Sequence, residues 1–121
     1  MRFKWTRGQR LSRGLEIRRT MDLGAKVVTP YATFFVSRNG LARSRAALIA
    51  SRRIGNAVAR NRARRRLREA LRRVWPDVAG GHDIVVVARS GALDAQWDEL
   101  QRAVALALER LSVCAHNGPL V

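Results

Sequence analysis

The chain has little of what disulfide-linked, metal-binding or catalytic proteins depend on. Its single cysteine, Cys114, excludes an intrachain disulfide and a cluster of thiolate ligands. Its two histidines, His82 and His116, stand apart from each other and from any pair of acids. The sequence therefore shows no zinc spacing and no base beside a nucleophile. We expect no catalytic side chains and no cofactor bound by the protein alone.

Long apolar runs are also missing. No stretch approaches the roughly 18 apolar residues that cross a bilayer, and the basic N-terminus lacks the apolar core of a signal peptide. No expected helix pairs a basic face with a wide Leu, Phe or Trp face, which disfavours binding at a membrane surface. The sequence predicts a soluble, cytoplasmic protein without a membrane partner.

Acidic residues are scarce. Nine Asp and Glu stand against 24 Lys and Arg, which gives a formal charge of +15 in 121 residues. Such a surface attracts polyanions, so nucleic acid is the first partner to expect. The length suits one domain. We expect a single domain over residues 1–121, with 1–13 as a basic arm and 112–121 as a frayed tail.

Turn residues and apolar patterns divide the first half of the chain. Apolar spacing predicts a short helix over 14–23. Residues 27–37 are rich in β-branched and aromatic side chains, and Pro30 predicts a short strand followed by a longer one. Asn39-Gly40 is a strong turn signal, so we expect 45–51 to be the returning strand of a hairpin.

The second half predicts two helices around one strand. Asn56 is a good cap for a helix that runs to about Arg73, and 83–88 has the continuous apolar run of a strand covered on both faces. Asp94 is expected to cap a last helix that continues to Leu111. This order predicts an α+β fold, a two-layer α/β sandwich in which helices pack on one mixed sheet.

The basic charge is concentrated in residues 52–73, which hold ten arginines and one acid, whereas 94–111 hold four acids and two arginines. Arg60, Arg64 and Arg68 repeat every four residues along one helix edge, where guanidiniums repel unless phosphates lie between them. Arginine grips phosphate with paired donors and stacks on exposed bases. The pattern predicts a nucleic-acid surface. A solvated charged helix is the alternative. Composition does not decide whether the nucleic acid is DNA or RNA.

This segment resembles the signature of the bacterial ribonuclease P protein family. The matching features, all in register, are Arg52-Arg53, Gly55, Ala57-Val58, Arg60-Asn61 and the basic run Arg62–Arg68. A weaker similarity extends over about residues 12–111. The resemblance implies the order helix, three strands, helix, strand, helix, with a left-handed crossover, although the physics of strand twist favours the opposite hand.

The resemblance also implies a function. The family's protein is an RNA-binding subunit that assists a catalytic RNA in removing the 5′ leader from precursor tRNA, with Mg²⁺ held through the RNA. The implied partners are the RNA subunit and the precursor tRNA leader, with no obligatory protein partner. A ribosome-associated or assembly protein that binds structured RNA is the alternative. A stand-alone nuclease is disfavoured, since carboxylates and histidines are not clustered.

The resemblance implies two RNA surfaces. The first belongs to the basic helix and the residues before it, namely Arg52, Arg53, Asn56, Arg60, Asn61, Arg62, Arg64, Arg65 and Arg68. The second is a leader cleft between the sheet and the first helix, lined by Ile17, Met21 and Phe35, with Tyr31 and Thr33 expected on the same face as Phe35. Ile17 and Met21 stand where the family usually has phenylalanines, so a plain core role for both is the alternative.

Overall fold

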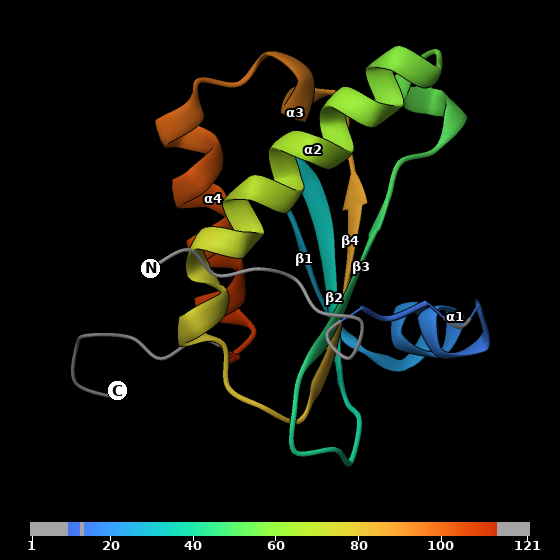
Figure 1. Cartoon of the computed structure of the whole chain (residues 1–121), viewed down its shortest axis with the longest axis vertical. Helices are drawn as coiled ribbons and strands as arrows, with labels where there is room; N and C mark the ends of the chain where they lie inside the picture. Colours follow the sequence, from blue (N-terminus) through green and yellow to red (C-terminus); the bar gives the residue numbers. More distant parts are fainter. Residues whose placement is uncertain (1–9, 13, 114–121) are drawn as a thin grey trace.

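The computed structural model describes residues 10–12 and 14–113 (Figure 1). Most of the expected basic arm and tail lies outside the described residues. The parts that are described are packed against the domain. Leu11 is buried, and its N–H donates to the carbonyl of Ala46 at 2.8 Å. Val113 is buried as well, and its carbonyl accepts from Ala79 N–H at 2.7 Å, so the expected frayed tail does not begin at residue 112.

The chain alternates helices and strands much as the apolar pattern predicts. Short 3-10 turns stand before and after the long basic helix, at Arg52–Ile54 and Trp75–Asp77. The helices and strands are α1 (Gly14–Leu23), β1 (Ala25–Val28), β2 (Ala32–Arg38), β3 (Arg45–Ile49), α2 (Ala57–Val74), β4 (His82–Ala88), α3 (Gly91–Asp94) and α4 (Trp97–Arg110).

The four strands form one mixed sheet in the order β1-β2-β4-β3. β1 and β4 pair antiparallel with β2, whereas β3 pairs parallel with β4. The expected hairpin between β2 and β3 is therefore wrong, because β4 lies between them; the hairpin joins β1 to β2 instead. β4 takes the centre since it is the strand that is apolar on both faces, and burial there removes the most apolar surface from water. The left-handed crossover stays a prediction.

The two faces of the sheet are covered unequally. On one face α2, α3 and α4 enclose the main core, in which Phe34, Leu67, Ile84 and Leu108 are almost fully buried. On the other face α1 covers a smaller cluster around Val85, and Figure 1 shows α1 apart from the other helices. The expected α+β fold is confirmed, with part of the second sheet face left accessible.

The boundaries of the helices confirm one expected cap and overturn another. Asn56 precedes α2, and its Oδ1 accepts the N–H of Ala59 at 2.9 Å, as expected of an N-cap. Asp94 does not cap the last helix, because it is the final residue of α3. α4 starts at Trp97 without a side-chain cap, and its first-turn acids, Asp98 and Glu99, favour the positive end of the helix dipole instead.

Candidate nucleic-acid interface

The start of the basic helix is fixed by a short turn. Ser51 Oγ accepts the N–H of Arg53 at 3.3 Å, and the 3-10 turn over Arg52–Ile54 ends at Gly55. Gly55 has φ +141°, a conformation that side-chain-bearing residues rarely adopt. This turn leaves Arg52 and Arg53 exposed and directs the chain into α2.

One flank of α2 uses its arginines to hold the neighbouring helices. Arg66 Nη1 donates to the carbonyl of Ala92 at 2.7 Å, and Arg66 Nη2 donates to that of Ala95 at 2.6 Å. Arg62 Nε donates to the carbonyl of Leu93 at 3.1 Å. These guanidiniums satisfy carbonyls at the end of α3 that have no partner within the helix. Arg62, which the resemblance assigns to RNA, is therefore engaged by the protein itself.

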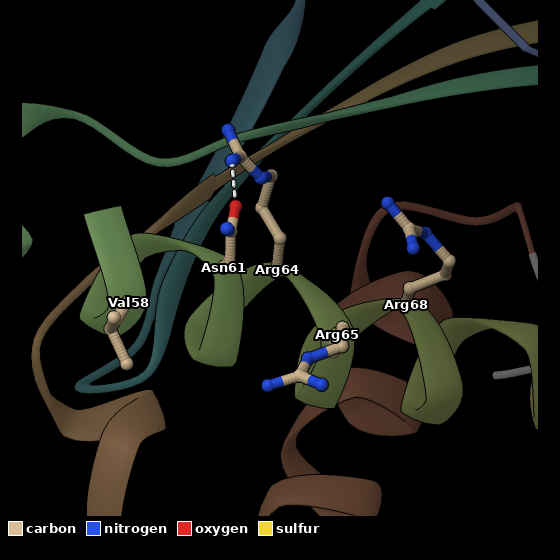
Figure 2. A pocket seen from close by; sticks show the side chains of 5 residues that line it. All are labelled: Val58, Asn61, Arg64, Arg65 and Arg68. Carbon is tan, nitrogen blue, oxygen red and sulfur yellow. Dashed lines mark hydrogen bonds between the residues drawn. The ribbon is translucent and has the colours of Figure 1, made fainter.

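The side of α2 that faces away from α3 is open to solvent. Here Val58, Asn61, Arg64, Arg65 and Arg68 line an open hollow of about 430 Å³ (Figure 2). An Arg64 N–H donates to Asn61 Oδ1, so the amide orients that guanidinium. None of the lining residues is acidic. Three guanidiniums around one hollow offer many donors to phosphate oxygens, and their mutual repulsion falls when an anion lies between them.

The structure brings together four of the nine expected RNA-binding residues in this hollow: Asn61, Arg64, Arg65 and Arg68. Arg60 lies beside it but donates to the Gly55 carbonyl at 3.1 Å. Of the other expected residues, Asn56 is the helix cap, Arg62 is bound to α3, and Arg52 and Arg53 lie in the 3-10 turn.

Val58 was missed by the sequence reasoning, although it is 74% exposed and lines the hollow. The sequence feature that could have identified Val58 is the spacing of residues 58, 61, 65 and 68, which places them on one helical face. An exposed aliphatic side chain beside guanidiniums adds an apolar contact for a ribose or an unpaired base.

Ion pairs reduce the positive charge at the C-terminal end of α2. Glu69 is the one acid of this helix, and it forms ion pairs with Arg72 and Arg73. The hydrogen bond from Arg72 holds the pKa of Glu69 below its ordinary value. Arg73 also lies over the Trp97 ring, 5.2 Å from its centroid. Uncompensated positive charge is therefore concentrated in the first two thirds of α2.

The expected leader face is only partly assembled as predicted. Ile17, Met21 and Phe35 are half-buried around the small cluster that contains Ala47 and Val85. Thr33 lies two residues before Phe35 in β2 and shares its face, also half-buried. The packing leaves both the core role and the binding role available to Ile17 and Met21, because neither is fully covered.

Tyr31 does not lie on that face, so this part of the prediction is wrong. It packs against the main core on the α4 side, and its hydroxyl donates to Glu99 Oε2 at 3.4 Å. The alternation of a strand does not reach Tyr31, because β2 begins only at Ala32. The preceding turn is held by Thr29, whose Oγ1 accepts the N–H of Tyr31 at 3.2 Å.

A second hollow, of about 370 Å³, lies at the β3 edge of the sheet and was not expected from the sequence. It is lined by Arg10, Leu11, Ser12, Ile17, Ala46, Ala47, Leu48, Ile49 and Arg68. Only Ile17 and Arg68 of these were candidate site residues. Arg68 thus lines both hollows.

An ion-pair network fixes α1 relative to the sheet. Arg45 on β3 contacts Asp83 on β4 at 2.7 Å and Glu16 on α1 at 3.0 Å. Asn39 Nδ2 also donates to Asp83, at 3.0 Å. The hydrogen bond to Asp83, with a smaller contribution from Glu16, raises the pKa of Arg45 above its ordinary value. Since α1 and β3 border the second hollow, this network maintains its shape.

The described part of the chain holds neither a metal cluster nor a membrane-spanning helix. Within residues 10–12 and 14–113, His, Cys, Asp and Glu nowhere gather in threes or more to hold a metal ion. Over the same residues, no helix combines the length and apolar character needed to cross a membrane.

Known proteins share both the sequence pattern and the fold. The Ribonuclease P family matches residues 5–112 of this chain. The ribonuclease P protein component of Symbiobacterium thermophilum is 47% identical over 75 residues, covering 62% of this chain and 65% of that protein. That of Herpetosiphon aurantiacus is 32% identical over 104 residues, covering 86% and 85%. The chain thus aligns with slightly less than two thirds of the Symbiobacterium protein.

Solved structures share this fold. The RNase P protein of Thermotoga maritima, in complex with 1-(4-fluorophenyl)-2-thiourea, has a TM-score of 0.74 at 26% identity and covers 84% of this chain and 98% of its own. The RNase P protein of Staphylococcus aureus has a TM-score of 0.77 at 24% identity, covering 88% and 98%.

Fold and site together define a small basic α+β protein whose long helix exposes an arginine-rich surface. The match over residues 5–112 then makes the family plain. The chain belongs to the ribonuclease P protein family.

Proposed function

We propose that this chain is the RNA-binding protein subunit of ribonuclease P and assists a catalytic RNA subunit in removing the 5′ leader from precursor tRNA. The observation that carries the proposal is the acid-free hollow of Asn61, Arg64, Arg65 and Arg68 on α2 of a member of this family. Its guanidiniums suit the closely spaced phosphates of folded RNA.

The protein's part in the reaction is binding and positioning. The α2 hollow neutralises phosphates of the RNA subunit, while Phe35, Ile17 and Met21 on the other sheet face contact the substrate leader. Hydrolysis is assigned to the RNA subunit, with Mg²⁺ held by phosphate and water oxygens, which this ion prefers. The proposed partners are thus two RNAs, and the proposed compartment is the cytoplasm.

Reconstitution tests this function directly. Precursor tRNA is incubated with the RNA subunit alone, the protein alone, or both, at low Mg²⁺. We expect the protein to stimulate release of the leader only when the RNA subunit is present. RNA binding without stimulation would favour the role in ribosome association or assembly, and cleavage by protein alone would show a nuclease; either result overturns the proposal.

Salt dependence tests the phosphate contacts. If several arginines neutralise phosphates, affinity for the RNA subunit should fall by orders of magnitude between about 50 and 200 mM salt. A nearly flat response would contradict phosphate binding by α2.

Variants separate the two proposed RNA surfaces. Arg64→Ala combined with Arg65→Ala should weaken assembly with the RNA subunit, by about 1.5 to 3 kcal/mol for each charge-assisted hydrogen bond that is removed. Phe35→Ala should leave assembly intact and reduce the preference for precursor over mature tRNA. Arg102→Ala, which removes an exposed charge on α4, is the matched control. If Phe35→Ala destabilises the domain while the protein that remains folded keeps its leader preference, Phe35 is a core residue and its leader contact is refuted.

A further inference from the structure

The outer edge of β1 is open. β1 ends the sheet, and its only strand partner among the described residues is β2. An edge strand presents N–H and C=O groups that a further strand can bind, and a lysine often protects such an edge. Here Lys26 lies with its Nζ 5.8 Å from the centroid of the Phe35 ring, on the sheet face that α1 covers. The edge is therefore left available for pairing on the side of α4.

A largely apolar groove of about 270 Å³ runs beside this edge. It lies between α4 and β1 with the turn that follows β1, and Val27, Val28 and Leu106 contribute to its lining. Val28 is 55% exposed and Leu106 is 48% exposed. Arg110 is the one charged residue of the lining. Exposed aliphatic side chains beside an unpaired strand are typical of a protein interaction site.

The side of α4 that borders the groove is complementary to itself. Glu99, Ala103, Leu106 and Arg110 are spaced i, i+4, i+7 and i+11, so they form one stripe along the helix. The acid stands in the first turn, where it accepts a hydrogen bond from the Tyr31 hydroxyl at 3.4 Å, and the base stands in the last turn. An antiparallel copy related by a two-fold axis places Arg110 opposite Glu99 of the second copy and Leu106 opposite its Ala103, twice over.

The same axis suits β1. Val27 lines the groove together with Ala103 and Leu106, so the middle of β1 lies level with the middle of the α4 stripe. Opposed residues of antiparallel strands share a face, and pairing centred on Val27 therefore places Lys26 opposite Val28 of the second copy. No like charges stand opposite each other in this register.

The net charge of the chain does not prevent such contact. Its +15 is concentrated on α2, whereas residues 94–111 hold four acids and two arginines, and residues 25–31 hold Lys26 as their one charge. The edge formed by β1 and α4 is thus slightly acidic. Long-range repulsion between two copies remains, and salt screens it.

We propose that two copies of this chain associate through β1 and α4, as a two-fold dimer in which the sheets join edge to edge. The inference goes beyond the proposed function, because the residues of the α2 hollow lie outside this edge and stay available to RNA. β1 has only four residues, so the interface is small and the dimer is weak.

Sedimentation velocity of the full chain, freed of nucleic acid, tests the dimer. At about 0.3 M salt, where repulsion is screened, we expect a Kd on the order of 10 to 100 µM. Arg110→Glu and Glu99→Arg should each raise the Kd at least about tenfold, because each places like charges opposite each other twice. Arg102→Glu makes the same charge change on α4 outside the groove lining and should retain the wild-type Kd.

Mixing the two charge variants is the decisive measurement. In a mixed dimer both ion pairs are restored with their signs exchanged, so Arg110→Glu with Glu99→Arg should associate within about threefold of the wild-type Kd. Restored association also shows that both variants are folded. Leu106→Lys, at a half-exposed position, tests the apolar contact separately and should weaken the dimer about tenfold with little change in Tm.

Three results would overturn the inference. A full chain that stays monomeric up to about 300 µM has no such dimer, well above the expected Kd. A dimer that the charge variants leave intact, or that their mixture does not restore, uses another surface. If the full chain is monomeric and a chain that ends at Val113 dimerises, residues 114–121 occupy the groove instead. All of these measurements are made without RNA, so their failure leaves the proposed function untouched.

Discussion

Replacing Arg66 tests whether the arginines of α2 divide into protein-binding and RNA-binding groups. Its guanidinium is partly buried and donates to two carbonyls of the α3 end, at 2.7 and 2.6 Å. Hydrogen bonds from charged groups contribute about 1.5 to 3 kcal/mol each when buried, and the freed carbonyls regain some water after truncation. We therefore expect Arg66→Ala to cost about 2 kcal/mol of folding free energy.

The melting temperature makes this loss visible. For a domain of this size, about 1 kcal/mol corresponds to roughly 4 °C, so Arg66→Ala should lower Tm by about 8 °C. Arg65 has no hydrogen-bond partner among the described residues and is exposed, so Arg65→Ala should stay within about 0.5 kcal/mol of wild type. The effects on RNA binding should be reversed. The slope of log affinity against log salt concentration should fall by about 1 in Arg65→Ala and stay at the wild-type value in Arg66→Ala.

Arg66→Lys is the matched variant. It keeps the charge but lacks the planar fork that reaches both carbonyls, so Tm should fall while the salt slope stays at the wild-type value. Thermal melting by circular dichroism and salt titration of binding to the RNA subunit give both readouts. A variant Arg66→Ala with normal Tm and a reduced salt slope would refute the division, since Arg66 would then contact RNA.

Three further changes test other parts of the structure. Asn56→Ala should cost about 0.5 to 2 kcal/mol in urea unfolding, because α2 loses its cap; an unchanged midpoint would mean that the cap is unimportant. Asp83→Ala should cost about 3 to 5 kcal/mol, since it strips a partly buried Arg45 of its main partner, and a smaller loss would show that water replaces the carboxylate. Glu69→Gln should reduce stability at pH 7, and this loss should shrink as pH falls below the unfolded pKa near 4.3: the hydrogen bond from Arg72 lowers the pKa of Glu69, so its contribution is present above the unfolded value and is lost as pH falls through the folded one. A difference that does not shrink as pH falls would exclude the ion pair as its cause.

The sequence by itself determined the local structure. The cap at Asn56 and the boundaries of α1 depend on residues within a few positions of one another, and the structure confirms both. The burial of β4 on both faces also follows from its own continuous apolar run. The concentration of arginine in one helix predicted a polyanion surface for the same reason, because charge density is a property of the segment.

The tertiary structure decided which strands are neighbours. Asn39-Gly40 does precede a reversal of the chain, but nothing local shows that β4, more than 40 residues later, inserts between β2 and β3. Likewise, Tyr31 could not be placed by alternation, because the turn at Thr29 ends the strand periodicity before it.

It also decided the use of each arginine. Helical spacing places Arg62 and Arg66 on one flank and Arg64 and Arg68 on the other, yet the two flanks look alike in sequence. Packing of α3 and α4 against one flank turned its arginines into donors to carbonyls and left the other facing solvent. Local propensity acts through neighbouring residues, whereas solvent exposure depends on segments far away in the chain, and exposure is what makes an arginine available to RNA.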